Sequence, residues 1–208
     1  MRNLLVIQAS ASGEGSVSRL LVEETVDRLL EAHPAAAVVR RDLGAAPVPH
    51  LTTATLAGVR GEPATDAEHE ARALSDALIA ELHAADTVVI GAPMYNFGIP
   101  TGLRSWFDYV LLVGKTFRYT EAGPQGLLAG KRVIVIEPRG GAYSEGPAQA
   151  FDFQEPYLRQ LLGFIGVTEV LFIRVERIGY GPDVRAASIA GAQAQLANHL
   201  ASTLGRAA

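Results

Sequence analysis

The sequence predicts a doubly wound α/β fold built on a five-stranded parallel sheet. Short apolar runs rich in β-branched residues at positions 4–7, 86–90 and 132–136 have the composition of strands that are buried on both faces. Segments with apolar residues at helical spacing separate these runs, and such alternation indicates parallel strands joined by helical crossovers. No break in composition and no internal repeat divides the chain, so we expect one domain over residues 1–208.

Each element follows from its local pattern. We expect the five strands at residues 4–7, 37–43, 86–90, 132–136 and 170–173. We expect helices after residue 18 and at residues 65–85, 101–110, 155–165 and 183–204, with a short helix near 53–59. Thr65 and Glu68 match a capping box. The helix at 101–110 is apolar all round, so we expect deep burial, which a dimer interface would supply. Residues 115–126 are rich in turn residues and compatible with a small hairpin.

The composition excludes several classes of protein. A net charge of −4 argues against a protein that binds nucleic acid through phosphate contacts. The chain contains no cysteine, which excludes disulfides, thiolate catalysis and cysteine metal sites. The five histidines lack the spacing of metal ligands, so we expect no metal site. Because neither a signal-peptide pattern nor a membrane-length apolar run is present, we expect a cytoplasmic protein that does not span a membrane.

Three unusual loops follow strands of the predicted sheet. Residues 9–18 form a serine-rich loop ahead of a helix, where free N–H groups and hydroxyls can bind a phosphate. Residues 91–100 place four large apolar side chains between two prolines, and residues 137–143 contain two glycines that permit close approach of a ligand. With the strand order 2-1-3-4-5, the ligand crevice lies between the ends of the first and third strands, which brings these loops together. A flat aromatic ring carrying one phosphate, the shape of FMN, suits them.

Each loop taken alone has a plainer explanation. Ser16 or Ser18 can merely cap the helix that follows. The aromatic side chains of residues 91–100 can pack inward as part of an ordinary strand-to-helix turn. Two consecutive glycines are a common turn signal. The FMN interpretation therefore depends on the three loops lying side by side.

Four blocks of the sequence carry a family resemblance. They are Ala92–Pro100, Thr116–Leu127, Arg139–Gly141 and Leu162–Gly166. In these blocks the chain resembles the FMN-dependent NADH:quinone oxidoreductases, also called azoreductases, and the likeness extends over nearly the whole chain. The most specific pieces are Met-Tyr-Asn-Phe in the first block and Thr-Phe-Arg-Tyr-Thr in the second. The resemblance implies a flavodoxin-like fold of order 2-1-3-4-5, and a homodimer with two FMN sites at its interface.

The resemblance also implies which residues form the FMN site. Phosphate contacts are implied for Ser10, Ser16, the backbone of Val17, and Ser18. Contacts along the isoalloxazine ring are implied for Met94, Tyr95, Asn96 and Phe97, and contacts near its pyrimidine end for Arg139, Gly140 and Gly141. Tyr119 matches an aromatic residue that borders the substrate pocket of the partner subunit. The chain departs from the family pattern at Pro138, which offers neither an N–H nor a hydroxyl where relatives often have a hydrogen-bonding residue.

The activity implied by the resemblance is a two-electron transfer. We expect a hydride to pass from NADH or NADPH to FMN, and two electrons to pass on to a quinone or an azo compound in ping-pong order. We expect no catalytic side chain, and we expect the N–H groups of Asn96 and Phe97 to stabilise charge on the reduced ring. Two alternatives remain open. One is a flavodoxin-type electron carrier without NADH turnover of its own, and the other is a non-flavin α/β enzyme that uses His50 or Asp42 as a base.

Overall fold

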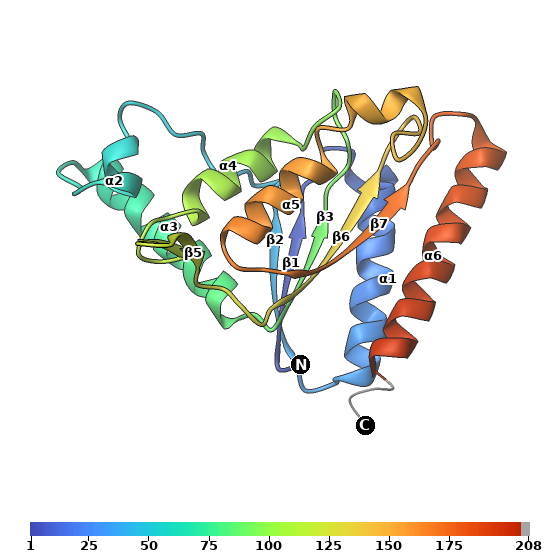
Figure 1. Ribbon diagram of the computed structural model, residues 1–208, viewed down its shortest axis with the longest axis horizontal. Coiled ribbons are helices and arrows are strands. Elements are labelled where there is room, and N and C mark those ends of the chain that lie inside the picture. Colours follow the sequence, from blue (N-terminus) through green and yellow to red (C-terminus); the bar gives the residue numbers. More distant parts are fainter. Residues whose placement is uncertain (205–208) are drawn as a thin grey trace.

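A five-stranded parallel sheet runs through the centre of the computed structural model, which describes residues 1–204, with side chains as far as Ser202 (Figure 1). In chain order its strands are β1 (Asn3–Gln8), β2 (Ala37–Asp42), β3 (Thr87–Gly91), β6 (Arg132–Pro138) and β7 (Glu169–Val175). Across the sheet the order is β2-β1-β3-β6-β7, and every neighbouring pair is parallel. Counting only these strands, this is the order 2-1-3-4-5, so the predicted topology is confirmed.

Helices cover both faces of the sheet. One face carries α1 (Val17–Ala32) and α6 (Pro182–Leu204), which lie side by side in Figure 1. The other face carries α3 (Asp66–Ala84), α4 (Thr101–Val110) and α5 (Glu155–Phe164). Shorter elements complete the described chain, namely the 3-10 helices η1 (Gly13–Gly15) and η2 (Pro147–Phe151), helix α2 (Leu56–Arg60), and strands β4 (Phe117–Thr120) and β5 (Gly123–Gly126). Within residues 1–204, no helix is both long and apolar enough to cross a lipid bilayer.

The central strands separate two apolar layers, because successive side chains of a strand point to opposite faces of the sheet. Leu5 and Ile7 of β1 pack into the layer under α3, α4 and α5. Leu4 and Val6 of the same strand pack into the layer under α1 and α6. Strand β2 lies at the edge and is largely exposed, as its charged end predicts. The two layers hold the middle of the sheet rigid and leave its ends to carry the loops.

The apolar helix α4 is buried within its own chain. Trp106, Phe107 and Tyr109 are each 1% exposed. Ser75 of α3 donates its hydroxyl to the carbonyl of Tyr109 at 2.7 Å, which ties α4 to its neighbour. The expectation that a dimer interface buries this helix is therefore wrong, because α3 and the sheet already cover it. The sequence pattern predicted the depth of burial correctly and its cause incorrectly.

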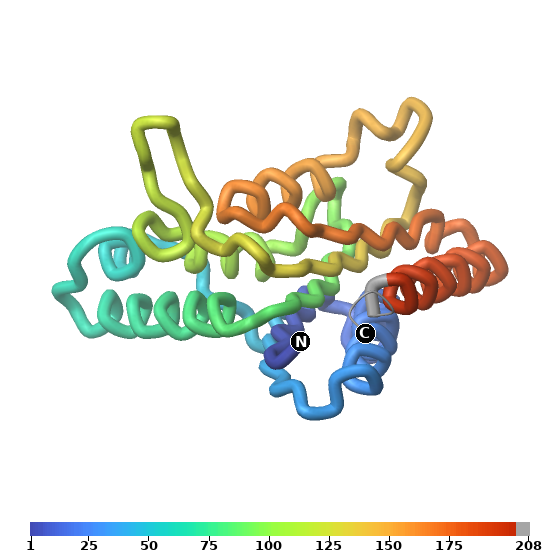
Figure 2. Tube along the Cα trace, turned by 60° about the horizontal axis from the view of Figure 1, so that its bottom comes forward, coloured from blue at the N-terminus to red at the C-terminus, as the bar shows by residue number. Residues whose placement is uncertain are grey.

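Strands β4 and β5 form the predicted hairpin, which extends away from the body of the molecule (Figure 2). Phe117 anchors its base, because its ring packs 4.5 Å from the ring of Phe164 on α5. Tyr119, further along the hairpin, is 70% exposed. The hairpin thus presents an aromatic side chain to its surroundings at a distance from the sheet.

The register of the strands brings three loops together at the carboxyl edge of the sheet. Gln8 at the end of β1 pairs with Gly91 at the end of β3. Past these pairs, the N–H of Ala9 donates to the carbonyl of Gly91 at 2.9 Å, and the N–H of Met94 donates to the carbonyl of Pro138 at 2.8 Å. The loops after β1, β3 and β6 are therefore neighbours, as the predicted topology requires.

Candidate functional site

The serine-rich loop after β1 ends in the first turn of α1. Ser10, Ser16 and Ser18 are 3%, 5% and 1% exposed. The hydroxyl of Ser16 accepts the N–H of Arg19 at 3.2 Å, so Ser16 is the N-cap of α1. The hydroxyls of Ser16 and Ser18 lie 3.0 Å apart and are hydrogen-bonded to each other. Ser16 therefore caps the helix, as one alternative predicts, and both Ser16 and Ser18 also line the pocket described below.

The start of α1 also offers backbone donors. The first N–H groups of a helix have no partner within the helix. In the described part of the chain, no acceptor is recorded for the N–H groups of Val17 and Ser18. They point out of the helix end that carries the positive pole of its dipole. Two hydroxyls and two N–H groups therefore converge at a place suited to an anion.

Tyr95 joins this polar corner to the loop after β3. Its hydroxyl lies 3.4 Å from the hydroxyl of Ser10 and accepts the N–H of Ala11 at 3.1 Å. The ring of Tyr95 is nevertheless 38% exposed. The phenol thus fixes the serine-rich loop against the aromatic loop while one part of the ring remains open to a ligand.

The turn at residues 95–98 holds its backbone in a strained conformation. Tyr95 and Gly98 exchange both of their backbone hydrogen bonds, at 3.0 and 3.1 Å. Between them, Asn96 has a φ of 48° and Phe97 a φ of 71°, values that a bulky side chain rarely adopts. This geometry turns Phe97 outward, where it is 46% exposed. The alternative that these aromatic side chains pack inward is wrong.

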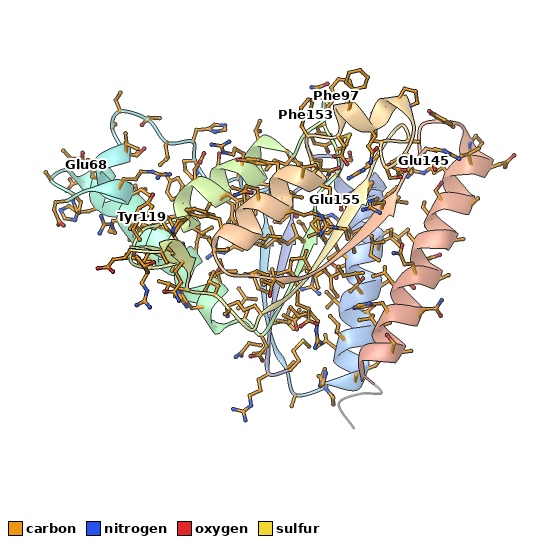
Figure 3. All side chains as sticks on the ribbon, in the orientation of Figure 1. Glu68, Phe97, Tyr119, Glu145, Phe153 and Glu155 are labelled. Atoms are coloured by element: carbon orange, nitrogen blue, oxygen red, sulfur yellow. The ribbon has the colours of Figure 1, made fainter. Side chains whose placement is uncertain are left out.

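Further aromatic rings surround Phe97. Its ring lies 6.0 Å from Tyr143 in an edge-to-face arrangement and 5.8 Å from Phe151. The N–H of Phe153 donates to the carbonyl of Phe97 at 3.1 Å. Figure 3 shows Phe97 and Phe153 beside each other at the carboxyl end of the sheet. An apolar, aromatic surface therefore adjoins the polar corner at the start of α1.

A pocket of about 130 Å³ opens between these loops, and its volume is roughly ten times what one water molecule requires. Seven of the residues proposed from the sequence line it, namely Ser10, Ser16, Val17, Ser18, Met94, Tyr95 and Gly140. Six further residues line it as well, namely Ser12, Gly15, Pro93, Pro138, Ile178 and Arg185. The proximity of Ser12, Gly15, Pro93 and Pro138 to predicted residues could have indicated them. Ile178 and Arg185 come from a segment that no motif had singled out.

Neither of the residues weighed as a base in a non-flavin enzyme lies in this pocket. Nδ1 of His50 is hydrogen-bonded to the hydroxyl of Ser105 at 2.8 Å. Asp42 forms an ion pair of 2.6 Å with Arg19, and its other carboxylate oxygen accepts the N–H groups that follow β2. Both side chains are engaged in holding elements together, and the pocket supplies no nucleophile and base pair from them.

Comparison with known proteins agrees with the fold. Residues 2–200 match a protein family described as having a flavodoxin-like fold. The chain is 66% identical over 197 residues to an FMN-dependent NADH:quinone oxidoreductase of Hyphomonas neptunium, and the match covers 95% of each chain. It is 47% identical over 199 residues to a protein of the same name from Ralstonia nicotianae, covering 93% of this chain and 94% of the other. The chain belongs to the family of the FMN-dependent NADH:quinone oxidoreductases. The resemblance carried by its four sequence blocks is thus confirmed.

The chain also resembles a solved structure. An azoreductase from Bacillus anthracis matches the fold with a TM-score of 0.87 at 32% sequence identity. The match covers 96% of this chain and 99% of that one. The flavodoxin-like fold predicted for the chain is therefore shown both by the sheet order and by its relatives.

Arg139 has a structural role that the Arg-Gly-Gly motif did not indicate. Its side chain is completely buried rather than turned toward the pocket. The guanidinium contacts Glu137 at 2.8 Å, Asp152 at 2.9 Å and Glu176 at 3.3 Å. Its Nε donates to Oε1 of Gln154 at 3.0 Å. Arg139 therefore joins β6 to the segments that lead into α5 and out of β7.

The partners of Arg139 in turn hold the loops of the site. Nε2 of Gln154 donates to the carbonyl of Ala92 at 2.6 Å, which fixes the start of the aromatic loop. Glu176 accepts the N–H groups of Tyr143 and Ser144 at 2.7 and 2.9 Å, which fixes the loop after β6. The ion cluster formed by Arg139, Glu137, Asp152 and Glu176 thus lies beneath the site and positions two of its three loops.

The remaining predicted residues lie beside the pocket or away from it. Asn96, Phe97 and Gly141 adjoin lining residues without lining the pocket themselves. A Cβ atom added at Gly140 would have no neighbour within 4 Å among the described residues, so the backbone here is open. Tyr119 lies well away from Phe97 and Phe153 in Figure 3, so it does not contribute to the pocket of its own chain.

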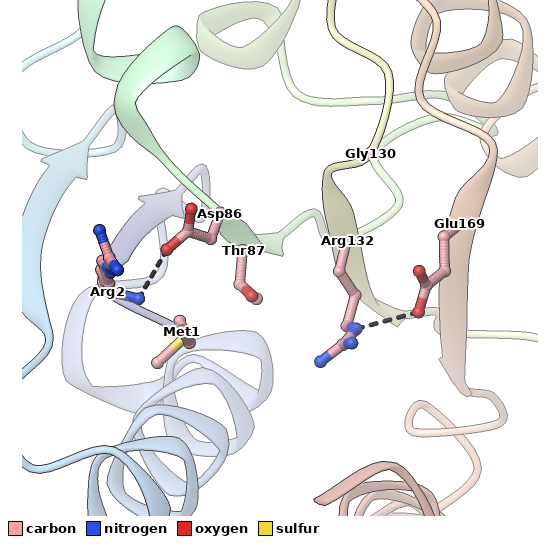
Figure 4. A pocket seen from close by; sticks show the side chains of 7 residues that line it. All are labelled: Met1, Arg2, Asp86, Thr87, Gly130, Arg132 and Glu169. Carbon is pink, nitrogen blue, oxygen red and sulfur yellow. Dashed lines mark hydrogen bonds and ion pairs between the residues drawn. The ribbon is translucent and has the colours of Figure 1, made fainter. Parts of the chain in front are cut away.

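A second pocket lies at the opposite, amino end of the strands and offers no comparable chemistry (Figure 4). Its acidic groups are already engaged. Asp86 accepts the N–H groups of Arg2 and Asn3 at 2.6 and 3.0 Å, and Glu169 pairs with Arg132 at 2.9 Å. Ligands of open α/β sheets bind at the carboxyl ends of the strands, where the first pocket lies.

The ion cluster around Arg139 contains one carboxyl group with an unusual acidity. Burial raises the pKa of Glu137 to about 8; Arg139 opposes the rise, and Glu155 and Asp152 add to it. Its Oε1 has no hydrogen-bond partner among the described residues, which disfavours the charged form. Folding therefore binds a proton between the ordinary glutamate pKa of 4.5 and about 8, and the free energy of unfolding falls as the pH rises through this window.

We predict that Glu137→Gln, which resembles the neutral acid, removes this loss of stability. Urea unfolding of both proteins should be measured from pH 5 to 9. Below pH 8, the free energy of unfolding of the variant should rise relative to that of the wild type by up to about 1.4 kcal/mol per pH unit. The control Glu145→Gln changes a side chain that is 73% exposed and should leave the pH profile unchanged. Parallel profiles for wild type and Glu137→Gln would contradict a neutral Glu137.

Proposed function

We propose that the protein is an FMN-dependent oxidoreductase that takes two electrons from NADH and passes them to quinones and aromatic azo compounds. The observation that carries the proposal is the pocket in which buried serine hydroxyls and free helix N–H groups adjoin exposed aromatic rings. It lies between the ends of β1 and β3, where doubly wound sheets bind their ligands. Relatives named for the use of FMN, NADH and quinones support the assignment.

The phosphate of FMN fits the polar corner of the pocket. Ser10, Ser16 and Ser18 would hold it with their hydroxyls, and Val17 with its backbone N–H. All of these donors are preformed, because Ser16 caps α1 and Tyr95 ties down the loop of Ser10. A phosphate therefore needs little rearrangement of the chain in order to bind.

The ring of FMN fits the surface formed by the loop after β3. Met94, Tyr95, Asn96 and Phe97 would lie along it, with Gly140 and Gly141 allowing the backbone after β6 to approach closely. The N–H groups of Asn96 and Phe97 have no recorded acceptor among residues 1–204 and can donate to the polar edge of the ring. When bound, FMN accepts a hydride from NADH and returns two electrons to the oxidising substrate.

The protein's own part in the reaction is to bind and orient. The strained turn at Asn96 and Phe97 presents donors in a fixed place, and the aromatic rings of Phe97, Phe151 and Phe153 give flat substrates an apolar surface. The same surface would receive NADH and the quinone in turn, which predicts ping-pong kinetics. No side chain of the pocket needs to act as a nucleophile.

We also propose that the protein works as a homodimer in which Tyr119 of each subunit borders the substrate pocket of the other. The hairpin of β4 and β5 extends from the body and exposes Tyr119 at a distance from its own pocket (Figures 2 and 3). A large aromatic side chain presented on a projecting hairpin is typical of a contact with a partner.

We predict that the double variant Ser16→Asp/Ser18→Asp loses FMN and keeps its fold. Aspartate is as good an N-cap as serine, so α1 should form, while two carboxylates repel the phosphate. Fluorescence titration of the apoprotein should show FMN affinity reduced at least about a hundredfold, with riboflavin, which has no phosphate, affected far less. The control Ser202→Asp adds a charge at an exposed position of α6. Unchanged FMN affinity in the double variant would reject the phosphate assignment.

We predict that Tyr119→Ala lowers kcat/KM for quinones roughly two- to tenfold, the value of one aromatic contact. A mixed dimer tests whether the contact crosses the interface. One subunit carries Tyr119→Ala and binds FMN, and the other carries Ser16→Asp/Ser18→Asp with Tyr119 intact. Purified with two different affinity tags, this dimer should recover wild-type activity per bound FMN. Activity that stays at the level of the Tyr119→Ala homodimer would show that Tyr119 does not serve the partner's site.

A further inference from the structure

Arg185 is the one positively charged side chain among the described residues that line the pocket. It comes from the amino-terminal end of α6, far in sequence from every motif of the site, and it is half-buried. Its Nη2 lies 3.5 Å from the carbonyl oxygen of Gly15, just before the first turn of α1. The guanidinium is therefore at the same end of the pocket as the serine hydroxyls.

Most N–H donors of the Arg185 guanidinium have no partner among the described residues. Within residues 1–202 no carboxylate oxygen lies within ion-pair distance of it, and the long contact to Gly15 uses one of five N–H groups. Other arginines near the site are engaged. Arg19 pairs with Asp42 at 2.6 Å, and Arg177 pairs with Glu145 at 3.0 Å. Arg185 differs from them in having no ion-pair partner in the part of the chain whose side chains are described.

The position of Arg185 is also unfavourable for the helix that carries it. The amino-terminal end of a helix is the positive pole of its dipole, where a cation is disfavoured. Helix α6 is joined to α1 further along by a hydrogen bond of 2.8 Å between Gln193 and Glu24, and its own first turn carries the acidic residue Asp183. The positive end of α1 and an arginine without an anionic partner among the described residues thus meet at one end of the pocket. An anion bound there would compensate both.

We propose that Arg185 supplies the formal positive charge for the phosphate of FMN and so makes the pocket select FMN over riboflavin. This inference rests on the proposed function, because it takes the phosphate end of FMN to occupy the corner formed by Ser16 and Ser18. Hydroxyl and N–H donors are neutral and cannot balance a phosphate that carries about two negative charges. A guanidinium forms charge-assisted hydrogen bonds with phosphate that are about twice as strong as neutral ones.

A plainer role for Arg185 would be to hold the carbonyl of Gly15 and so shape the serine-rich loop. Three variants separate the two roles. Arg185→Gln keeps an N–H donor for Gly15 and removes the charge, Arg185→Lys keeps the charge, and Arg185→Met removes both. A role in shaping the loop would affect FMN and riboflavin alike, whereas a role for the charge affects only the ligand with the phosphate.

The test is the affinity of the full-length apoprotein for FMN and for riboflavin, measured by quenching of flavin fluorescence at several salt concentrations. We expect Arg185→Gln and Arg185→Met to weaken FMN binding about tenfold to a hundredfold, with riboflavin unchanged within about twofold. Arg185→Lys should retain most of the FMN affinity. The salt dependence of FMN binding should become shallower in the two neutral variants, because one charge contact is lost.

Each other outcome overturns the inference. Equal weakening of FMN and riboflavin in Arg185→Met, with Arg185→Gln intact, would assign Arg185 to the shape of the loop. Unchanged FMN affinity in all three variants, with a higher KM for NADH, would place the guanidinium against the electron donor instead. A wild-type protein that binds neither flavin would refute the proposed function as well, whereas the first two results leave the proposed function in place.

Discussion

A completely buried guanidinium organises the end of the sheet where the site lies. Removing an arginine from water is costly unless its donors find partners. Each nitrogen of the Arg139 guanidinium contacts a side-chain oxygen, from the nearby Glu137 and from three residues further along the chain, Asp152, Gln154 and Glu176. Of these partners, Gln154 also donates a hydrogen bond to the carbonyl of Ala92, and Glu176 accepts hydrogen bonds from the N–H groups of Tyr143 and Ser144. The loops after β3 and β6 are thus placed by one ion cluster. Besides Arg139 this cluster includes Arg159 and Arg174, which both pair with Glu155, so with Glu137 neutral its three arginines are balanced by three carboxylates, those of Asp152, Glu155 and Glu176.

The site above this cluster has two ends with different physical character. The polar end is preformed, since Ser16 caps α1 and the hydroxyl of Tyr95 secures the serine-rich loop. The apolar end is strained and exposed, with positive φ values at Asn96 and Phe97 and an open cluster of aromatic rings. Strain and exposed apolar area both cost stability, and they persist where a ligand or a partner makes use of them. A cofactor with a phosphate at one end and a flat ring at the other matches this division.

The sequence was sufficient to predict the sheet and the position of the loops, because both depend on local patterns. Runs such as Val88–Ile90 identify buried strands by themselves, and the capping box at Thr65 and Glu68 identifies the start of α3. The roles of Arg139 and Arg185 could not be predicted in this way. Arg139 belongs to a recognisable Arg-Gly-Gly block, yet its partners lie up to 37 residues away, and ion pairs over such separations leave no local pattern. Arg185 lies 170 residues from Gly15, and only the packing of α6 against α1 brings the two together. The contacts of helix α4 could not be predicted either, because its composition indicates that it is buried but not which elements cover it.

We propose that these loops hold FMN and that the bound FMN exchanges electrons with NADH and a quinone. The most direct measurement is the visible absorption spectrum of the purified protein after FMN is added and the excess removed, followed by anaerobic addition of NADH and then of a quinone. We predict a retained flavin spectrum that NADH bleaches and the quinone restores. Retained flavin that NADH leaves unchanged would indicate an electron carrier, and the absence of retained flavin would contradict the assignment of the pocket.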